Sequence, residues 1–227
     1  PNIDSALKVV ETECKSIGFK STKLRFSEKG FDTINNLYAE IGNGKPHFSF
    51  AGHVDVVPAN KKDWAVDPFA GLIKNNNLIG RGAVDMKSAI ACFLSATKSY
   101  LEENKNFKGK ISMLITGDEE TYAVNGTKKI LKWLKKKRIK VDACLVGEPT
   151  NLKNLGDSMR IGRRGGFNGI VEVQGKAGHS AWPNRTINPV SGLMQMLTNI
   201  NKKVLDKGTK HFQPSIIQIT SIDVGNE

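Results

Sequence analysis

Three short apolar runs in this sequence end directly in acidic or histidine side chains. The run "HFSFAG" is followed by His53 and Asp55, "KISMLIT" by the acids Asp118–Glu120, and "DACLVG" by Glu148. Apolar runs of this length are typical of buried strands, whereas adjacent carboxylates repel one another and resist burial. A bound cation at the strand ends would make such acids tolerable, so the sequence has to be searched for the other groups that would hold one.

The segments around these runs predict an alternation of strands and helices. We expect helices over residues 4–17, 86–104 and 128–137, and strands over residues 47–52, 110–116 and 142–147. Short apolar strands separated by helices favour an α/β fold, with a mostly parallel sheet covered by helices on both faces.

The pattern changes near residue 161, where we place a domain boundary between residues 1–161 and 162–227. Alternating apolar residues predict strands after residue 166 and over 215–225, with a helix over 188–205 between them. A β–α–β unit of this size could barely bury its sheet, so we expect this second α+β domain to be incomplete and the natural chain to continue.

A net charge of +12 raises the question of nucleic-acid binding. Much of the surplus lies in residues 127–140, where Ile130, Leu131 and Leu134 form an apolar stripe and the lysines fall largely on the opposite face. A solvated amphipathic helix explains this pattern better than a nucleic-acid site, because no basic groove with interleaved aromatic residues accompanies it. We expect no nucleic-acid partner.

The cysteines and the hydropathy indicate a cytoplasmic protein without a membrane partner. Cys92 and Cys144 lie in apolar contexts, "AIACFL" and "DACLVG", which predicts reduced thiols in the core rather than a disulfide framework. No run of about 18 uncharged apolar residues predicts a membrane-spanning helix.

The polar residues at the strand ends form a candidate metal centre. In an open parallel sheet, sites form at the carboxyl ends of the strands, and a helix N-terminus there also favours anions. Imidazole and carboxylates without clustered thiolates suit zinc, cobalt or manganese, and two such ions would neutralise the acids at 118–120. One of Glu119 and Glu120 could bind metal while the other acts as general base. Five of the candidate residues follow the three predicted strands, and the sixth, Asp85, lies at the start of a predicted helix. The five are His53, Asp55, Glu119, Glu120 and Glu148.

Each candidate taken alone has a simpler explanation. His53 could be a satisfied loop histidine, the acids 118–120 a solvated turn, Asp85 a helix N-cap, and Glu148 an ordinary turn acid. All four explanations must hold at once if there is no site, so the joint pattern favours the metal centre.

A series of motifs spread over almost the whole chain resembles the M20 family of metallopeptidases and deacylases. In order, they are "FAGHVDVVP", "WAVDPFAG", "GRGAVDMKSAIACFL", "ITGDEE", "AVNGTKKI", "CLVGEPT", "LGDSMRIGRRGG" and "QGKAGHSAWPNRTINP". The resemblance implies a catalytic domain of zinc-aminopeptidase type. It also implies an inserted α+β lid domain that forms a homodimer.

The resemblance implies a metal-binding role for four residues. His53 and Glu148 would hold one zinc ion, Glu120 the other, and Asp85 would bridge the two. The peptide bond after Asp85 is typically cis in this family. Cobalt or manganese could replace zinc.

Four further residues receive other roles from the resemblance. Glu119 would be the general base and acid, and Asp55 would orient His53. His179 would belong to the lid domain and stabilise the oxyanion in the active site of the partner subunit. Arg163 would bind a carboxylate of the substrate.

Within the family, "NGTKK", "GRRG" and "GHSAWP" followed by "NP" point to one branch. That branch hydrolyses N-succinyl-LL-2,6-diaminopimelate to succinate and LL-2,6-diaminopimelate, for lysine and cell-wall synthesis. The alternatives are an acetylornithine deacetylase or a dipeptidase of the same family, and a non-catalytic binding module.

Two departures from the family pattern bear on this interpretation. The family's second zinc site takes a further histidine from a late segment, and no histidine of this sequence matches it. Ser180, Trp182 and Asn184 replace the residues more common in the branch, which bears on substrate specificity rather than on the chemistry.

Overall fold

The computed structural model describes residues 3–225, which divide between Met159 and Arg160 into two compact units. No helix in this range is both long and apolar enough to cross a membrane. The larger unit contains helices α1 (Ile3–Ile17), α2 (Ser88–Glu103) and α3 (Thr127–Lys136), short helical turns at Lys61–Asp63 and Ala83–Lys87, and strands β1 (Lys20–Glu28), β2 (Phe31–Asn43), β3 (His47–His53), β4 (Leu72–Lys74), β5 (Asn77–Ile79), β6 (Gly109–Thr116) and β7 (Ala143–Val146).

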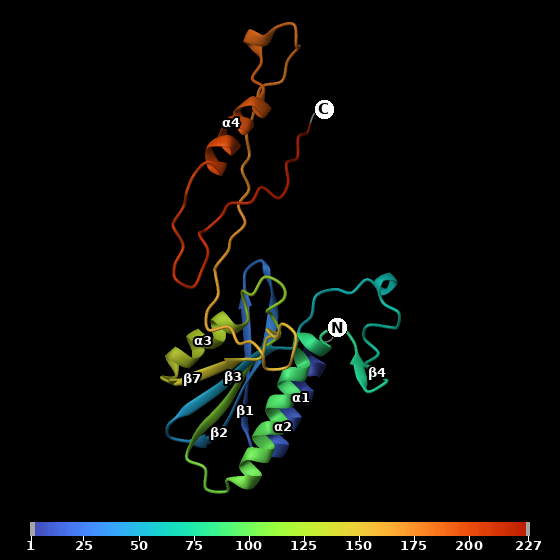
Figure 1. The fold of residues 1–227 in the computed structure, drawn as a ribbon, viewed down its shortest axis with the longest axis vertical. Helices are drawn as coiled ribbons and strands as arrows, with labels where there is room; N and C mark the ends of the chain where they lie inside the picture. The colour runs from blue at the N-terminus through green and yellow to red at the C-terminus, as the bar shows by residue number, and fades with distance from the viewer. Residues whose placement is uncertain (1–2, 226–227) are drawn as a thin grey trace. The chain divides into compact units, whose positions relative to one another are not determined.

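The centre of the larger unit is a five-stranded sheet in the order β1-β2-β6-β3-β7 (Figure 1). Strand β3 pairs in parallel with both β6 and β7, whereas β2 is antiparallel to its neighbours β1 and β6. Strands β4 and β5 form a separate hairpin. The predicted α/β class is confirmed, and the parallel strands are the three that end in candidate ligands.

Helices cover both faces of this sheet. Side chains of α1 and α2 form one core with Phe50, Met113 and Ile115, and α1 and α2 lie side by side on that face (Figure 1). On the other face, Ile130 and Leu134 of α3 pack with Leu114 and other sheet residues. Successive residues of β6 therefore point to opposite cores, which explains why the sequence from Met113 to Ile115 is continuously apolar.

The antiparallel hairpin β1–β2 was not predicted. Most residues of β1 are exposed, with Leu24 its only buried one, so its sequence lacks a continuous apolar run. Strand β2 is buried only in its middle, where the polar Asn36 precedes the apolar residues Leu37–Ala39. The β1–β2 hairpin is stabilised by pairing with β6, which is distant in the sequence.

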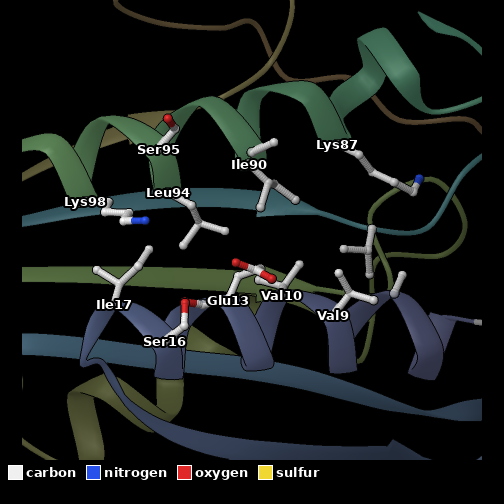
Figure 2. Close-up of a pocket in the computed structure, with 13 residues that line it drawn as sticks. Val9, Val10, Glu13, Ser16, Ile17, Lys87, Ile90, Leu94, Ser95 and Lys98 are labelled. Atoms are coloured by element: carbon white, nitrogen blue, oxygen red, sulfur yellow. The ribbon is translucent and has the colours of Figure 1, made fainter. Parts of the chain in front are cut away.

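A groove of about 630 Å³ lies between α1 and α2 (Figure 2). Its walls are largely apolar, with Val10, Ile17, Ile90 and Leu94 among the lining residues. None of the candidate ligands lines this groove. The polar site lies instead at the end of the sheet, where the parallel strands stop.

The predicted burial of Cys92 and Cys144 is wrong. Both are exposed, and the buried cysteine is Cys14 on the inner face of α1. Cys92 lies on the side of α2 turned away from the core, although its sequence neighbours include buried residues. Cys144 is exposed because β7 is an edge strand that pairs only with β3.

The smaller unit contains helix α4 (Pro189–Asn201) and a short turn at Pro183–Arg185. The Asn188 side chain caps α4 by accepting a hydrogen bond from the Val190 amide. The strands predicted after residue 166 and over 215–225 are not formed, and the only strand-like pairing among residues 160–225 is an isolated bridge, Lys176–Ile187. An alternating sequence favours a strand, but a strand also needs a partner for its backbone groups.

The thiols provide a test of this packing. Burial raises the pKa of Cys14 to about 12, so it has little thiolate at pH 8, whereas Cys92 faces solvent. Treating the native protein with iodoacetamide at pH 8 should label Cys92 at least about tenfold faster than Cys14, as measured by mass spectrometry of peptides. Labelling in urea, where both thiols are accessible, is the control. Equal native rates would contradict the docking of α1.

Candidate metal centre

The register of the parallel strands brings their carboxyl ends to one edge of the sheet. His53, the last residue of β3, lies opposite Thr116, the last residue of β6. Ala51 of β3 lies opposite Val146, the last residue of β7. Glu119 and Glu120 follow β6 and Glu148 follows β7, so these side chains meet beside His53.

His53 is almost fully buried, and its two ring nitrogens face different groups. Nδ1 lies 3.0 Å from the backbone carbonyl oxygen of Asp55, which can only accept, so Nδ1 carries the proton. Nε2 faces carboxylates, at 3.1 Å from Asp85 Oδ1 and 3.4 Å from Glu148 Oε1. A histidine held in this way presents Nε2 as a metal ligand.

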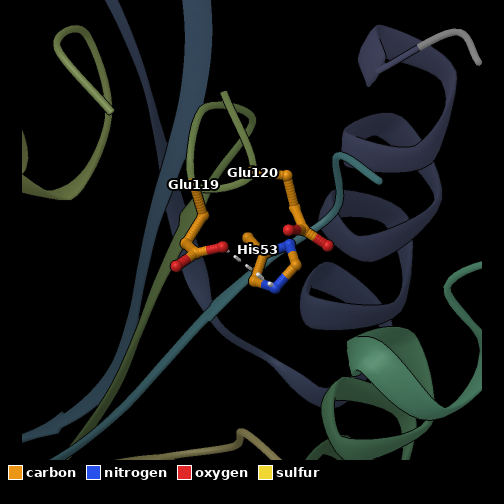
Figure 3. A group of neighbouring side chains, drawn as sticks. All are labelled: His53, Glu119 and Glu120. Carbon is orange, nitrogen blue, oxygen red and sulfur yellow. Dashed lines mark ion pairs between the residues drawn. The ribbon is translucent and has the colours of Figure 1, made fainter. Parts of the chain in front are cut away.

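Two groups of side chains at this edge have the composition of metal sites. His53, Glu119 and Glu120 form one group (Figure 3), and His53, Asp85 and Glu148 form the other. In each group the ligand atoms lie within 4.8 Å of one another. One imidazole with several carboxylates suits zinc, manganese or cobalt, so the donor set fits the predicted ions. The structure brings the predicted ligands together; their assignment to individual ions stays a prediction.

Asp55 connects the end of β3 to the loop after β6. Its buried Oδ2 accepts hydrogen bonds from the backbone amides of Glu119, at 2.9 Å, and Glu120, at 2.8 Å. Its Oδ1 lies 3.5 Å from His53 Nδ1. His53 Nδ1 makes its hydrogen bond to the Asp55 backbone carbonyl rather than to this carboxylate oxygen, so the orienting role of the Asp55 side chain stays a prediction. The two amide contacts were not predicted. Asp55 therefore positions parts of both candidate groups.

The charges of this cluster are poorly matched without a cation. Burial raises the pKa of Glu119, and the charges of Glu120, Asp55 and Asp85 raise it further, against the effect of His53. Burial opposes the charged form of His53, but hydrogen bonds and charge from Asp55, together with the charge of Glu119, raise its pKa to about 9. Protons balance part of the negative charge, and a divalent cation would displace them.

The backbone places Asp85 at the site without using it as a helix cap. Neither the turn at Ala83–Lys87 nor α2 has a side-chain cap, so the N-cap alternative for Asp85 is wrong. The Asp85–Met86 peptide bond is cis, as the resemblance implies. Met86 is fully buried beside two glycines at the strand ends, Gly52 and Gly147, where an added Cβ would lie 2.6 Å from Met86 Cε.

Sequence reasoning missed Lys87, which directly follows Met86. Its buried Nζ has no hydrogen-bond partner, and burial lowers the pKa of the amine against the charges of Asp55, Asp85 and Glu120. Lys87 therefore places a buried amine near the carboxylates of Asp55, Asp85 and Glu120. The sequence did offer a signal for Lys87, since it lies two residues after the candidate ligand Asp85 and just before α2.

Arg163 and His179 lie in the smaller unit, where both are exposed. The candidate metal centre lies wholly in the larger unit. The roles predicted for these two residues stay predictions.

Comparison with known proteins shows the family of this chain. Residues 49–221 match Peptidase family M20/M25/M40. The chain belongs to this family. It is 49% identical over 227 residues to a succinyl-diaminopimelate desuccinylase of Parvibaculum lavamentivorans, covering all of this chain and 57% of that protein. It is also 49% identical over 221 residues to the protein of the same name from Pelagibacter ubique, covering 97% and 58%. The chain thus spans less than two thirds of these relatives.

Two solved structures share the fold of this chain over part of its length. Human carnosine dipeptidase 1 matches with a TM-score of 0.56 at 23% identity, over 63% of this chain and 32% of that one. The M20 family metallo-carboxypeptidase Sso-CP2 from Sulfolobus solfataricus matches with a TM-score of 0.53 at 27% identity, over 64% and 32%. These matches agree with the α/β architecture of the larger unit.

The packing around Met86 gives a prediction for Gly147→Ala. The new Cβ would lie 2.5 Å from Phe50 Cζ and 2.6 Å from Met86 Cε, so both buried side chains must move. We expect a loss of about 1–3 kcal/mol in the free energy of unfolding, and weaker zinc binding because Asp85 and Glu148 adjoin the disturbed residues. Denaturant unfolding and zinc titration calorimetry measure the two effects.

Gly165→Ala is the matched control, because nothing lies within 4 Å of its added Cβ and its φ is not in the left-handed region. It should leave both quantities unchanged. Normal zinc affinity in Gly147→Ala, with its stability reduced, would show that Met86 does not help to place the ligands.

Proposed function

We propose that the protein containing this chain hydrolyses N-succinyl-LL-2,6-diaminopimelate to succinate and LL-2,6-diaminopimelate. The observation that carries the hydrolytic activity is the convergence of His53, Asp85, Glu119, Glu120 and Glu148 at one sheet edge. The substrate is supported by the name of the relatives that are 49% identical along this chain. These relatives are longer, so the proposal concerns the complete gene product.

We propose that two zinc ions occupy the site, with cobalt or manganese as possible substitutes. His53 and Glu148 would hold one ion, Glu120 the other, and Asp85 would bridge them. When bound, the ions would polarise the amide carbonyl and lower the pKa of a water molecule.

In this mechanism Glu119 moves the proton. Its side chain is 48% exposed, so it can reach a water molecule and a substrate while its backbone amide is held by Asp55. Burial and the charges of the neighbouring carboxylates raise its pKa against the opposing charge of His53, which favours proton uptake. Glu119 would accept the proton of the attacking water and then donate it to the leaving amine.

The remaining proposals concern the smaller unit and the setting of the reaction. Arg163 would bind the succinyl carboxylate through its planar guanidinium group. The protein would form a homodimer through the lid domain, residues 162–227, so that His179 stabilises the oxyanion in the partner's site. A cytoplasmic location, which the cysteine pattern predicts, suits a biosynthetic reaction.

The first test compares N-succinyl-LL-2,6-diaminopimelate with N-acetylornithine and a dipeptide, using the complete, zinc-loaded protein. We expect strong preference for the succinyl substrate, and Glu119→Gln should lower kcat by at least about 100-fold because it cannot accept a proton. Zinc binding by this variant is the control. Preference for the acetyl substrate or the dipeptide would favour the other M20 activities. No turnover with zinc bound would favour a binding module.

A second prediction tests how the substrate is recognised. Arg163→Lys replaces a bidentate donor, so kcat/KM for the succinyl substrate should fall about 10- to 100-fold. Arg164→Lys is the matched control, since Arg164 donates to the Pro214 carbonyl and would not bind substrate. Steady-state kinetics of both variants decide the question. Equal losses would sink the specific role of Arg163.

A further inference from the structure

We propose that Asp118 is a positioning residue whose buried carboxylate sets the loop that presents Glu119 and Glu120 to the metal centre. The proposal rests on the function proposed above for Glu119 and Glu120. It does not give Asp118 a role as a ligand.

Asp118 is 4% exposed and accepts hydrogen bonds along the loop that follows it. Its Oδ1 accepts from the Thr121 hydroxyl at 2.7 Å and the Ala123 amide at 3.1 Å, and its Oδ2 accepts from the Asn125 amide at 2.7 Å. Hydrogen bonds to a charged acceptor in a buried site are stronger than neutral ones. One side chain therefore fixes the curvature of the loop from residue 118 to residue 125.

Asp118 is absent from both candidate metal groups found among residues 3–225, although it adjoins Glu119. The prediction that metal ions neutralise all the acids at 118–120 is therefore wrong for Asp118. Donors from the loop compensate its charge instead. The same loop is held on its other side by Asp55, which accepts the amides of Glu119 and Glu120.

The far end of the loop is anchored through Asn125, which is also buried. Its carbonyl oxygen accepts from Asn36 Nδ2 at 3.0 Å, and its Nδ2 donates to the Asp32 carbonyl at 2.7 Å. Lys129 Nζ donates to Asn125 Oδ1 at 2.6 Å. Asn36 in turn accepts from the Thr116 hydroxyl at 2.6 Å. This network connects the loop to the β1–β2 hairpin and to the end of β6.

The backbone of the loop depends on these contacts. Ala123 has a φ of 52°, a left-handed conformation that is unfavourable for alanine, and its amide is one of the donors to Asp118. Gly126 follows the anchor, and an added Cβ there would lie 2.4 Å from the Asp118 carbonyl oxygen. Removing the Asp118 acceptor would free the loop to adopt other conformations, in which Glu119 and Glu120 leave their positions.

The test uses Asp118→Asn, which keeps the size of the side chain but replaces one acceptor oxygen by a donor. In the metal-free protein, the amides of residues 119–125 should exchange hydrogen at least about tenfold faster than in the wild type. Zinc affinity should fall about 10- to 100-fold. In the complete, zinc-loaded protein, kcat should fall about 100-fold while KM changes less than about threefold.

Thr121→Val provides a milder variant if Asp118→Asn folds poorly. It removes one hydrogen bond to Asp118 at an exposed position. The same quantities should change in the same direction by about threefold, the size of the loss of one hydrogen bond.

Leu134→Ala is the matched control for lost stability. Leu134 is a residue of α3 that packs in the core between this helix and the sheet, and its apolar side chain makes no hydrogen bond to the loop. This variant should lower the melting temperature but leave loop exchange, zinc affinity and kcat near wild type. The proposal is overturned if Asp118→Asn changes these three quantities no more than Leu134→Ala does.

Failure of the proposed function gives a different result. If the wild-type protein turns over none of the substrates, the hydrolase proposal fails. Hydrogen exchange and zinc affinity still decide whether Asp118 positions the loop: faster exchange with weaker zinc binding in Asp118→Asn supports that role, and unchanged values refute it.

Discussion

The parallel pairing of β3 with both β6 and β7 is the constraint on which the candidate site depends. Parallel neighbours end at the same edge of a sheet, so His53, Glu119 and Glu148 meet although they are far apart in the sequence. An antiparallel β7 would carry Glu148 to the opposite edge. A shift of β3 by one residue would turn its side chains to the other face. The helices that cover the sheet make this pairing possible, because each crossover returns the chain to the same starting edge.

The parts predicted from sequence are those whose signal is local. Strands β3, β6 and β7 are short apolar runs bounded by polar residues, and the amphipathic helices α1 and α3 show their buried face in the spacing of residues such as Ile130 and Leu134. The hairpin β1–β2 lacks such a signal because it is largely polar. Cys92 shows the same limit, since an apolar neighbourhood in sequence does not tell which face of a helix a residue occupies.

The acids after β6 illustrate why the site itself was only partly predictable. Asp118 is buried among loop donors, whereas Glu119 and Glu120 face His53. Three adjacent carboxylates in a sequence do not reveal these directions. Asp118 is oriented by its amide donating to the Thr116 hydroxyl and by its carboxylate accepting from the Asn125 amide. Thr116 and Asn125 are both hydrogen-bonded to Asn36 of the hairpin. In the smaller unit the local signal is clear but the structure does not follow it. Apolar and polar residues alternate near residue 170, as in a strand, yet the described residues provide no neighbouring strand for it to pair with.

The hydrogen bonds that join Asn125 to Asn36 and to the Asp32 carbonyl have a consequence for protein design. The hairpin β1–β2 contributes no candidate ligand, yet it carries the anchors of the loop that presents two of them. The run "ITGDEE" therefore does not contain all the contacts that fix its loop. A designer who transplants it onto another parallel sheet would transfer the acids without their scaffold, and would need to transplant the antiparallel neighbour as well.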